Sequence, residues 1–175
     1  MPTHCTSTSF TGDTNFAAII EPDGSVLAVG RHQLYHCAHW NDTDSCNVTE
    51  VHGMKGEDPF IYRDPRNPTK VLHMLRHFGR DTYNWTGNNG LHQFSLDDGV
   101  TWHHFDQLAY PCFATFEDGS SEGFMMRERP ALVFDKDGHT PLALTNGAAP
   151  GPFTATGQGG KNDYAYTLLQ KLNQD

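Results

Sequence analysis

The chain has 175 residues, of which 19% are charged, together with 17 Gly, 10 Pro and 11 His. This length fits a single globular domain, and the composition is rich in turn formers and poor in helix formers. The formal net charge of -9 argues against nucleic acid or an anionic membrane surface as partner. No stretch approaches the roughly 18 apolar residues of a membrane-spanning helix, so we expect no membrane span.

Short apolar runs alternate with Asp-Gly and Pro-containing turns along the whole chain, which predicts an all-β protein. The expected strand pairs are 17–20 with 25–29, 59–62 with 71–75, 91–95 with 101–105, and 131–134 with 141–145. A last strand is expected at 164–172. The hairpins recur about every 40 residues, a period typical of β-propeller blades.

This period predicts one β-propeller domain over residues 1–175, which we expect to be partial. The expected blade units lie near 13–35, 52–80, 90–112 and 124–148, with a closing strand at 163–173. Five blades of this size need over about 200 residues, and the hairpins account for roughly four. We therefore expect either that a first blade is missing or that the ring is completed by self-association with a second copy.

One turn has a more specific pattern, because residues 95–102 fit S-x-D-x-G-x-T-W, the motif called the Asp box. In this motif Asp97 would cap the turn, Gly99 would adopt a positive φ, and Trp102 would pack beneath the turn. The motif carries structure more than chemistry. The alternative is an ordinary Asp-Gly hairpin.

The cysteines and glycosylation sequons indicate an extracytoplasmic protein. The four cysteines contain no C-x-x-C pair, which favours disulfides over a zinc site. Cys37 and Cys46 flank the polar segment 38–45 and could staple it as a loop. Cys5 and Cys112 would then form the second pair, as one of the possible connectivities. Three sequons support secretion, at Asn41, Asn47 and Asn84, although the chain begins without a signal-peptide pattern.

Two segments place a carboxylate next to a proline at the start of an apolar run, Glu57-Asp58-Pro59 and Glu128-Arg129-Pro130. A buried carboxylate needs a partner, because an unpaired buried charge costs several kcal/mol. In a propeller these carboxylates would converge on a central pocket, as glycoside hydrolysis requires. The alternative is that Glu57 and Glu128 form structural ion pairs with Arg63, Arg127 or Arg129.

Five runs occur in an order that resembles a known family. They are residues 57–64 (EDPFIYRD), 72–77 (LHMLRH), 94–102 (FSLDDGVTW), 127–135 (RERPALVFD) and 144–147 (LTNG). The series spans about residues 13 to 173 and looks like the glycosyl hydrolase family 43-like five-bladed β-propellers. It is most similar to the subgroup with EDPF, HML and RERP signatures. This resemblance implies an all-β propeller of the five-bladed glycosidase type that acts on a poly- or oligosaccharide.

The resemblance also implies catalytic roles. Glu128 would be the general acid, and Asp58 would orient and tune it. No residue matches the general base of the family's first blade, which we expect upstream of residue 1; Asp13 is a poor substitute. Other polar side chains fit a sugar pocket: Asn15, Arg31, Glu57, Arg76, His77, Arg129 and Asn146. Tyr62, Trp85 or Trp102 could stack on a sugar, although core packing is the stronger interpretation for each.

No cofactor is implied, and the histidines do not suggest a metal site. His103 and His104 are adjacent, so on a strand they point to opposite faces, and His73 and His77 are too far apart on one face. Two other functions remain open beside hydrolysis. The chain could be a non-catalytic carbohydrate-binding propeller that lacks the base, or a structural or interaction propeller whose carboxylates pair with arginines.

Overall fold

The computed structural model describes residues 15–78, 89–150 and 165–173, and these ranges contain strands and turns without any helix. The all-β prediction is confirmed. The strands are β1 (Ala17–Ile20), β2 (Val26–Val29), β3 (Gln33–His39), β4 (Asp42–Glu50), β5 (Glu57–Arg63), β6 (Leu72–Phe78), β7 (Asn89–Ser95), β8 (His103–Tyr110), β9 (Phe113–Thr115), β10 (Ser121–Phe134), β11 (Pro141–Pro150) and β12 (Tyr166–Lys171). Over the same ranges, nothing helical is long and apolar enough to cross a lipid bilayer.

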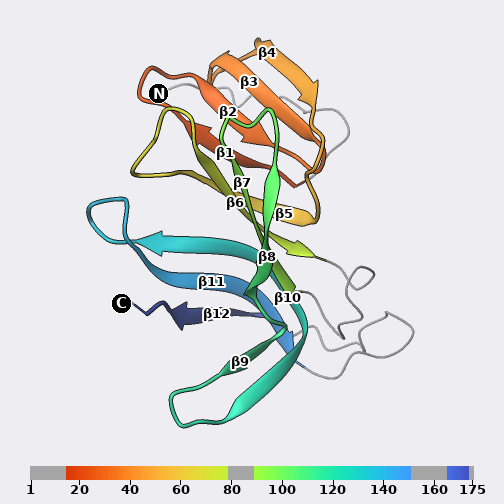
Figure 1. The fold of residues 1–175 in the computed structure, drawn as a ribbon, viewed down its shortest axis with the longest axis vertical. Coiled ribbons are helices and arrows are strands. Elements are labelled where there is room, and N and C mark those ends of the chain that lie inside the picture. Colours follow the sequence, from red (N-terminus) through yellow and green to blue (C-terminus); the bar gives the residue numbers. More distant parts are fainter. Residues whose placement is uncertain (1–14, 79–88, 151–164, 174–175) are drawn as a thin grey trace, which may run out of the picture.

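The described strands form three four-stranded antiparallel sheets, which follow one another from top to bottom in Figure 1. The first two sheets have the simple orders β1-β2-β3-β4 and β5-β6-β7-β8. In the third, β12-β11-β10-β9, the long strand β10 pairs with β9 through residues 121–123 and with β11 from Phe124 onward. Four-stranded antiparallel sheets of this kind are the units of propellers. A five-bladed ring stays a prediction.

The sheets divide the chain differently from the expected hairpin units. The sequence pattern places the hairpins near 52–80 and 90–112 in separate blades, but β6 pairs with β7 and unites them in one sheet. Each predicted strand has an observed counterpart. Strands β3, β4 and β9 were not predicted, because β4 (DTDSCNVTE) is largely exposed and polar and β9 has three residues.

The cysteine segment is therefore a hairpin and not a loop. Cys37 and Cys46 are direct cross-strand partners of β3 and β4 and are joined by a disulfide, which confirms that pair. Asn41 lies in the connecting turn and Asn47 on β4, and both are exposed. Cys112 is half-buried, whereas Cys5 and the third sequon at Asn84 lie outside the described residues, as do Asp13 and Trp85.

Two apolar cores lie between neighbouring sheets. The core between the first and second sheets contains nine buried residues: Leu27, Val29, Leu34, Val51, Met54, Ile61, Leu72, Met74 and Trp102. The core between the second and third sheets contains Leu75, Tyr110 and Leu144. Along β6, Leu72 and Met74 belong to the first core and Leu75 to the second. This follows from the period of two by which strand side chains alternate between faces.

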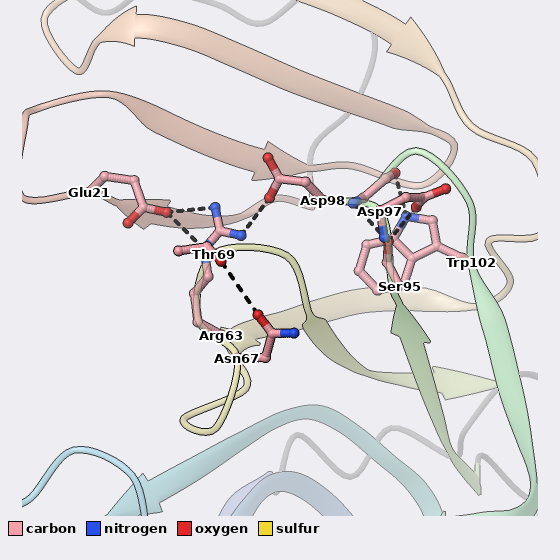
Figure 2. A network of polar contacts seen from close by, with 9 residues as sticks. Glu21, Arg63, Asn67, Thr69, Ser95, Asp97, Asp98 and Trp102 are labelled. Atoms are coloured by element: carbon pink, nitrogen blue, oxygen red, sulfur yellow. Dashed lines mark hydrogen bonds and ion pairs between the residues drawn. The ribbon is translucent and has the colours of Figure 1, made fainter.

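The turn between β7 and β8 has the geometry that the Asp-box pattern predicts (Figure 2). Asp97 accepts hydrogen bonds from the Thr101 backbone N–H at 2.9 Å and from the Thr101 hydroxyl at 2.7 Å. Gly99 has a φ of 90°. The Trp102 indole N–H donates to the Gly99 carbonyl at 2.9 Å, and its side chain is 5% exposed. Trp102 is thus a core residue and does not present its ring to a ligand.

Arg63 joins the first sheet to the second, as Figure 2 shows. Its guanidinium donates to the Glu21 carboxylate at 2.8 and 2.9 Å and also pairs with Asp98 of the Asp box. Burial lowers the pKa of Arg63, but the two carboxylates outweigh it and hold the pKa above its ordinary value. Arg63 therefore forms a structural ion pair, although not with Glu57 or Glu128.

Candidate functional site

The two proline-containing segments adopt the same backbone shape at the same point of neighbouring strands. Asp58 in β5 has a φ of 50° and Arg129 in β10 a φ of 51°. Each lies within an irregularity of strand pairing, between Glu57 and Phe60 and between Glu128 and Ala131. Positive φ is uncommon outside glycine, and strained backbone of this kind concentrates at functional sites. Strand β10 packs against β5, so the two bulges belong to adjacent sheets.

A pocket of about 340 Å³ opens where β1, β5 and β10 come together. It is lined by Asn15 and Phe16, by Asp58 and Pro59, and by residues 129–131. Three of the candidate residues from the sequence analysis, Asn15, Asp58 and Arg129, therefore lie at one pocket. They come from all three sheets or from the segments that lead into them.

Asp58 is held between two cationic or potentially cationic side chains. Its Oδ2 atom lies 3.2 Å from His77 Nδ1 and 3.9 Å from Arg129 Nε. The Asp58 and His77 side chains are 10% and 8% exposed, whereas Arg129 is 77% exposed. His77 Nδ1 is buried and makes no hydrogen bond of regular geometry within the described residues. A buried polar atom left in this state is rare and commonly marks a functional position.

Tyr110, at the end of β8, is a site residue that the sequence analysis missed. Burial raises the pKa of its phenol above the ordinary value, and the charges of Asp58 and Glu128 raise it further, while Arg127 and Asn146 oppose them. The Tyr110 hydroxyl is buried without a hydrogen bond of regular geometry among the described residues.

The Tyr110 ring occupies space that a neighbouring glycine leaves open. Gly90 pairs with Tyr110 across β7 and β8, and a Cβ at Gly90 would lie 2.2 Å from the ring. The Arg127 guanidinium lies 4.6 Å from the ring centroid on its face, a cation–π geometry. An aromatic residue facing a strand glycine is the sequence signal for this position, because glycine within a strand often marks a close approach.

Asn146 supports the main chain of Glu128. It is 1% exposed, its Oδ1 accepts from Arg127 Nε at 3.0 Å, and its Nδ2 donates to the Glu128 carbonyl at 3.4 Å. Arg127 also donates to the carbonyls of Pro111 and Phe113, at 3.0 Å each. Glu128 itself is half-buried. The Arg127–Asn146 pair therefore fixes the backbone that carries the expected general acid.

Glu57 forms an ion pair with a partner that the sequence analysis did not assign to it. Its carboxylate lies 2.6 Å from Arg31 Nη2, and both side chains are nearly half exposed. Arg76 is fully buried and donates to the carbonyls of Gly30, Arg31 and Gly56. It therefore ties the segment before Arg31 to the segment before Glu57, and its burial removes it from contact with a ligand.

Tyr62 and His73, which the sequence analysis also considered, do not belong to this site. The Tyr62 ring stacks on His73 at 5.0 Å and packs against Phe134 at 5.5 Å, which is a role in packing. Across the described ranges, no group of three or more His, Cys, Asp or Glu side chains is arranged to hold a metal ion.

Comparison of the chain with protein families, with curated proteins and with solved structures finds no match. The functional assignment therefore depends on the residues of the site and on the resemblance of the sequence motifs.

Proposed function

We propose that the pocket at Asp58 is a carbohydrate site of the glycoside hydrolase type, with Glu128 as general acid and Asp58 as the carboxylate that orients and tunes it. One observation carries this proposal. Asp58, a nearly buried carboxylate, and Arg129, which directly follows Glu128 in β10, line the same open pocket. Paired carboxyl groups beside a polar pocket are the chemical requirement for cleavage of a glycosidic bond.

In this proposal Glu128 protonates the leaving oxygen of the glycosidic bond. Asp58 lies between His77 and Arg129, and its role in this proposal is to orient Glu128. Arg129, which is mostly exposed, and Asn15 are placed to bond sugar hydroxyls at the pocket mouth.

Carbohydrate binding without hydrolysis is the second candidate, and a specific observation favours it. Asp58 is the one carboxylate among the described residues that line the pocket, and it is already paired with His77 and Arg129. Hydrolysis by inversion needs a further carboxylate to activate water, and without it most of the rate is lost. A structural role is the third candidate, and it predicts carboxylate–arginine pairs such as Arg31–Glu57 and Arg63–Glu21.

A panel of oligosaccharides, assayed for reducing ends and for binding by calorimetry, tests both candidates. For a hydrolase, we expect Glu128→Gln to lose at least about 100-fold in kcat while binding persists. The matched control is Glu117→Gln, an exposed glutamate whose loss should leave both readings unchanged. Binding without turnover in the unsubstituted protein would reject hydrolysis in favour of the binding module. Absence of both binding and turnover across the panel would reject the carbohydrate site.

The setting that fits this proposal is a secreted propeller. The Cys37–Cys46 disulfide and the exposed Asn41 and Asn47 support an oxidising, extracytoplasmic location. The three antiparallel sheets support a propeller, and we propose that its ring is completed by self-association. A glycosidase-sensitive mass shift after expression in a secreting eukaryotic host tests the first point. Sedimentation analysis tests the second, and a monomer at all concentrations would contradict self-association.

A further inference from the structure

A second polar cluster lies on the second sheet, apart from the Asp58 pocket. His73 Nε2 lies 2.9 Å from Asp64 Oδ2, and His73 Nδ1 lies 3.0 Å from His92 Nε2. Asp64 is 5% exposed and also accepts hydrogen bonds from the Arg66 backbone at 2.7 Å and from its guanidinium at 2.9 Å. The three side chains Asp64, His73 and His92 form a continuous hydrogen-bonded series, in which both nitrogens of His73 are used.

The positions of the protons in this series follow from Asp64. The hydrogen bonds from Arg66 and His73 hold the pKa of Asp64 well below its usual range, so this carboxylate is ionised and can only accept. His73 Nε2 must therefore carry a proton. A neutral His73 then accepts at Nδ1, and His92 must donate from Nε2. This leaves the Nδ1 atom of neutral His92 with a lone pair.

His92 also lines a pocket. The pocket has a volume of about 370 Å³ and is formed by His92 together with residues 105–109 of β8. The Phe105 ring lies 4.6 Å from the His92 ring and is 43% exposed, so it gives the pocket an accessible aromatic wall. Within the described residues, His92 Nδ1 makes no hydrogen bond.

We propose that Asp64, His73 and His92 form a hydrogen-bonded relay that makes His92 Nδ1 the acceptor for a neutral ligand with a flat ring and an O–H donor, of the phenol class. The ligand O–H donates to His92 Nδ1, His92 Nε2–H donates to His73 Nδ1, and His73 Nε2–H donates to the Asp64 carboxylate. Each proton stays on its atom, so the ligand remains neutral.

The surrounding groups favour a neutral ligand. The charged and titratable groups packed around the relay are Tyr62 from β5, Arg66 and Asp64 from the following turn, and Asp106 from β8, which lines the pocket. Asp106 and the net charge of -9 disfavour an anion. Phe105 favours a ring that can stack on it.

Acylation by diethyl pyrocarbonate at pH 7 tests the relay, because this reagent attacks the free lone pair of neutral imidazole. Mass spectrometry would follow His92, with the exposed His103 of the same molecule as internal reference. We expect Asp64→Asn to slow His92 modification about tenfold relative to His103, the equivalent of about one pKa unit of basicity. Circular dichroism of the variant checks that the slower rate does not come from unfolding. An unaltered or faster relative rate in this variant would overturn the relay.

Nitrogen NMR of the folded protein gives a second test that does not depend on variants. We expect His92 to be the tautomer protonated at Nε2, and the opposite tautomer would overturn the proposal. Titration with phenol should shift the His92 Nδ1 resonance, whereas anisole, which has the same ring without the donor, should shift it at least about tenfold less at equal concentration. Equal responses to phenol and anisole, or no response to either, would overturn the ligand assignment.

Discussion

The two faces of the central sheet β5–β8 differ in the side chains that they bury. The face toward the first sheet contributes Ile61, Leu72, Met74 and Trp102 to a nine-residue apolar core. The face toward the third sheet contributes Leu75 and Tyr110 to a core of three buried residues. It also carries His73, His77 and His92, and the buried polar atoms without regular hydrogen bonds, His77 Nδ1 and Tyr110 Oη, belong to this side.

One sheet therefore places the side chains that stabilise the fold on one face and the polar clusters on the other. Successive strand residues point to opposite faces, so β6 can supply Leu72 and Met74 to packing while His73 and His77 serve polar clusters. Burying polar groups without full hydrogen bonding costs free energy, which the apolar face must offset.

The largest effect is expected on the apolar face. Trp102→Ala removes the ring that fills the first core and its hydrogen bond to Gly99, so the free energy of unfolding should fall by about 3–5 kcal/mol. Denaturation by urea measures it. Val100→Ala, at a position that is 59% exposed two residues away, should change stability by less than about 0.5 kcal/mol. Equal effects of the two substitutions would refute the role of Trp102.

A smaller effect on stability is expected from the titration of His92, on the face of the central sheet that packs toward the third sheet. Burial, and then the charge of His73, lower the pKa of His92 to about 4 from an ordinary value of 6.5. Between pH 4 and 6.5, His92 is protonated in the unfolded chain and neutral in the folded state. The contribution of His92 is therefore fully present above pH 6.5 and is lost as the pH falls toward 4, by about 3 kcal/mol.

Thermal or urea denaturation between about pH 4 and 7 measures this dependence. His92→Gln should flatten the profile in that window, because the titrating group is gone. His103→Gln, an exposed histidine on the neighbouring strand, is the matched control and should leave the slope unchanged. A slope that survives His92→Gln would assign the pH dependence to another group.

The smallest effect on stability is expected at Tyr110. Tyr110→Phe removes a buried hydroxyl that lacks a regular hydrogen bond, so stability should stay unchanged or rise by up to about 1 kcal/mol. Carbohydrate binding at the Asp58 pocket, measured by calorimetry, should persist in the same variant, because Tyr110 does not line that pocket. A loss of more than about 1 kcal/mol in stability would show that the hydroxyl is satisfied in solution.

The sequence predicted those features of the fold that depend on local patterns. The Asp-box motif predicted the Ser95–Trp102 turn, because side chains within eight residues determine its hydrogen bonds. Strands flanked by Asp-Gly turns were located in the same way. Strand β4 was missed because its residues are mostly polar and exposed, and strand pairing there comes from β3 and the Cys37–Cys46 disulfide.

The site was predictable in its residue types and less so in its contacts. Asp58 and Arg129 were nominated as separate residues, and the structure shows them at one pocket. The Arg31–Glu57 pair was not assigned because it joins segments of different sheets, and sequence separation contains no information on that distance. Tyr110 and the Asp64–His73–His92 series were missed for the same reason: each depends on the pairing of β6, β7 and β8.

The matching bulges at Asp58 and Arg129 also have an evolutionary consequence. A repeated backbone shape presents two equivalent positions, and here one holds an acid and the other a base of opposite charge. Because the shape is shared, a single codon change at either position could alter the charge of the pocket without a new fold. A scaffold of this kind allows the ligand of the pocket to change while the strands around it stay the same.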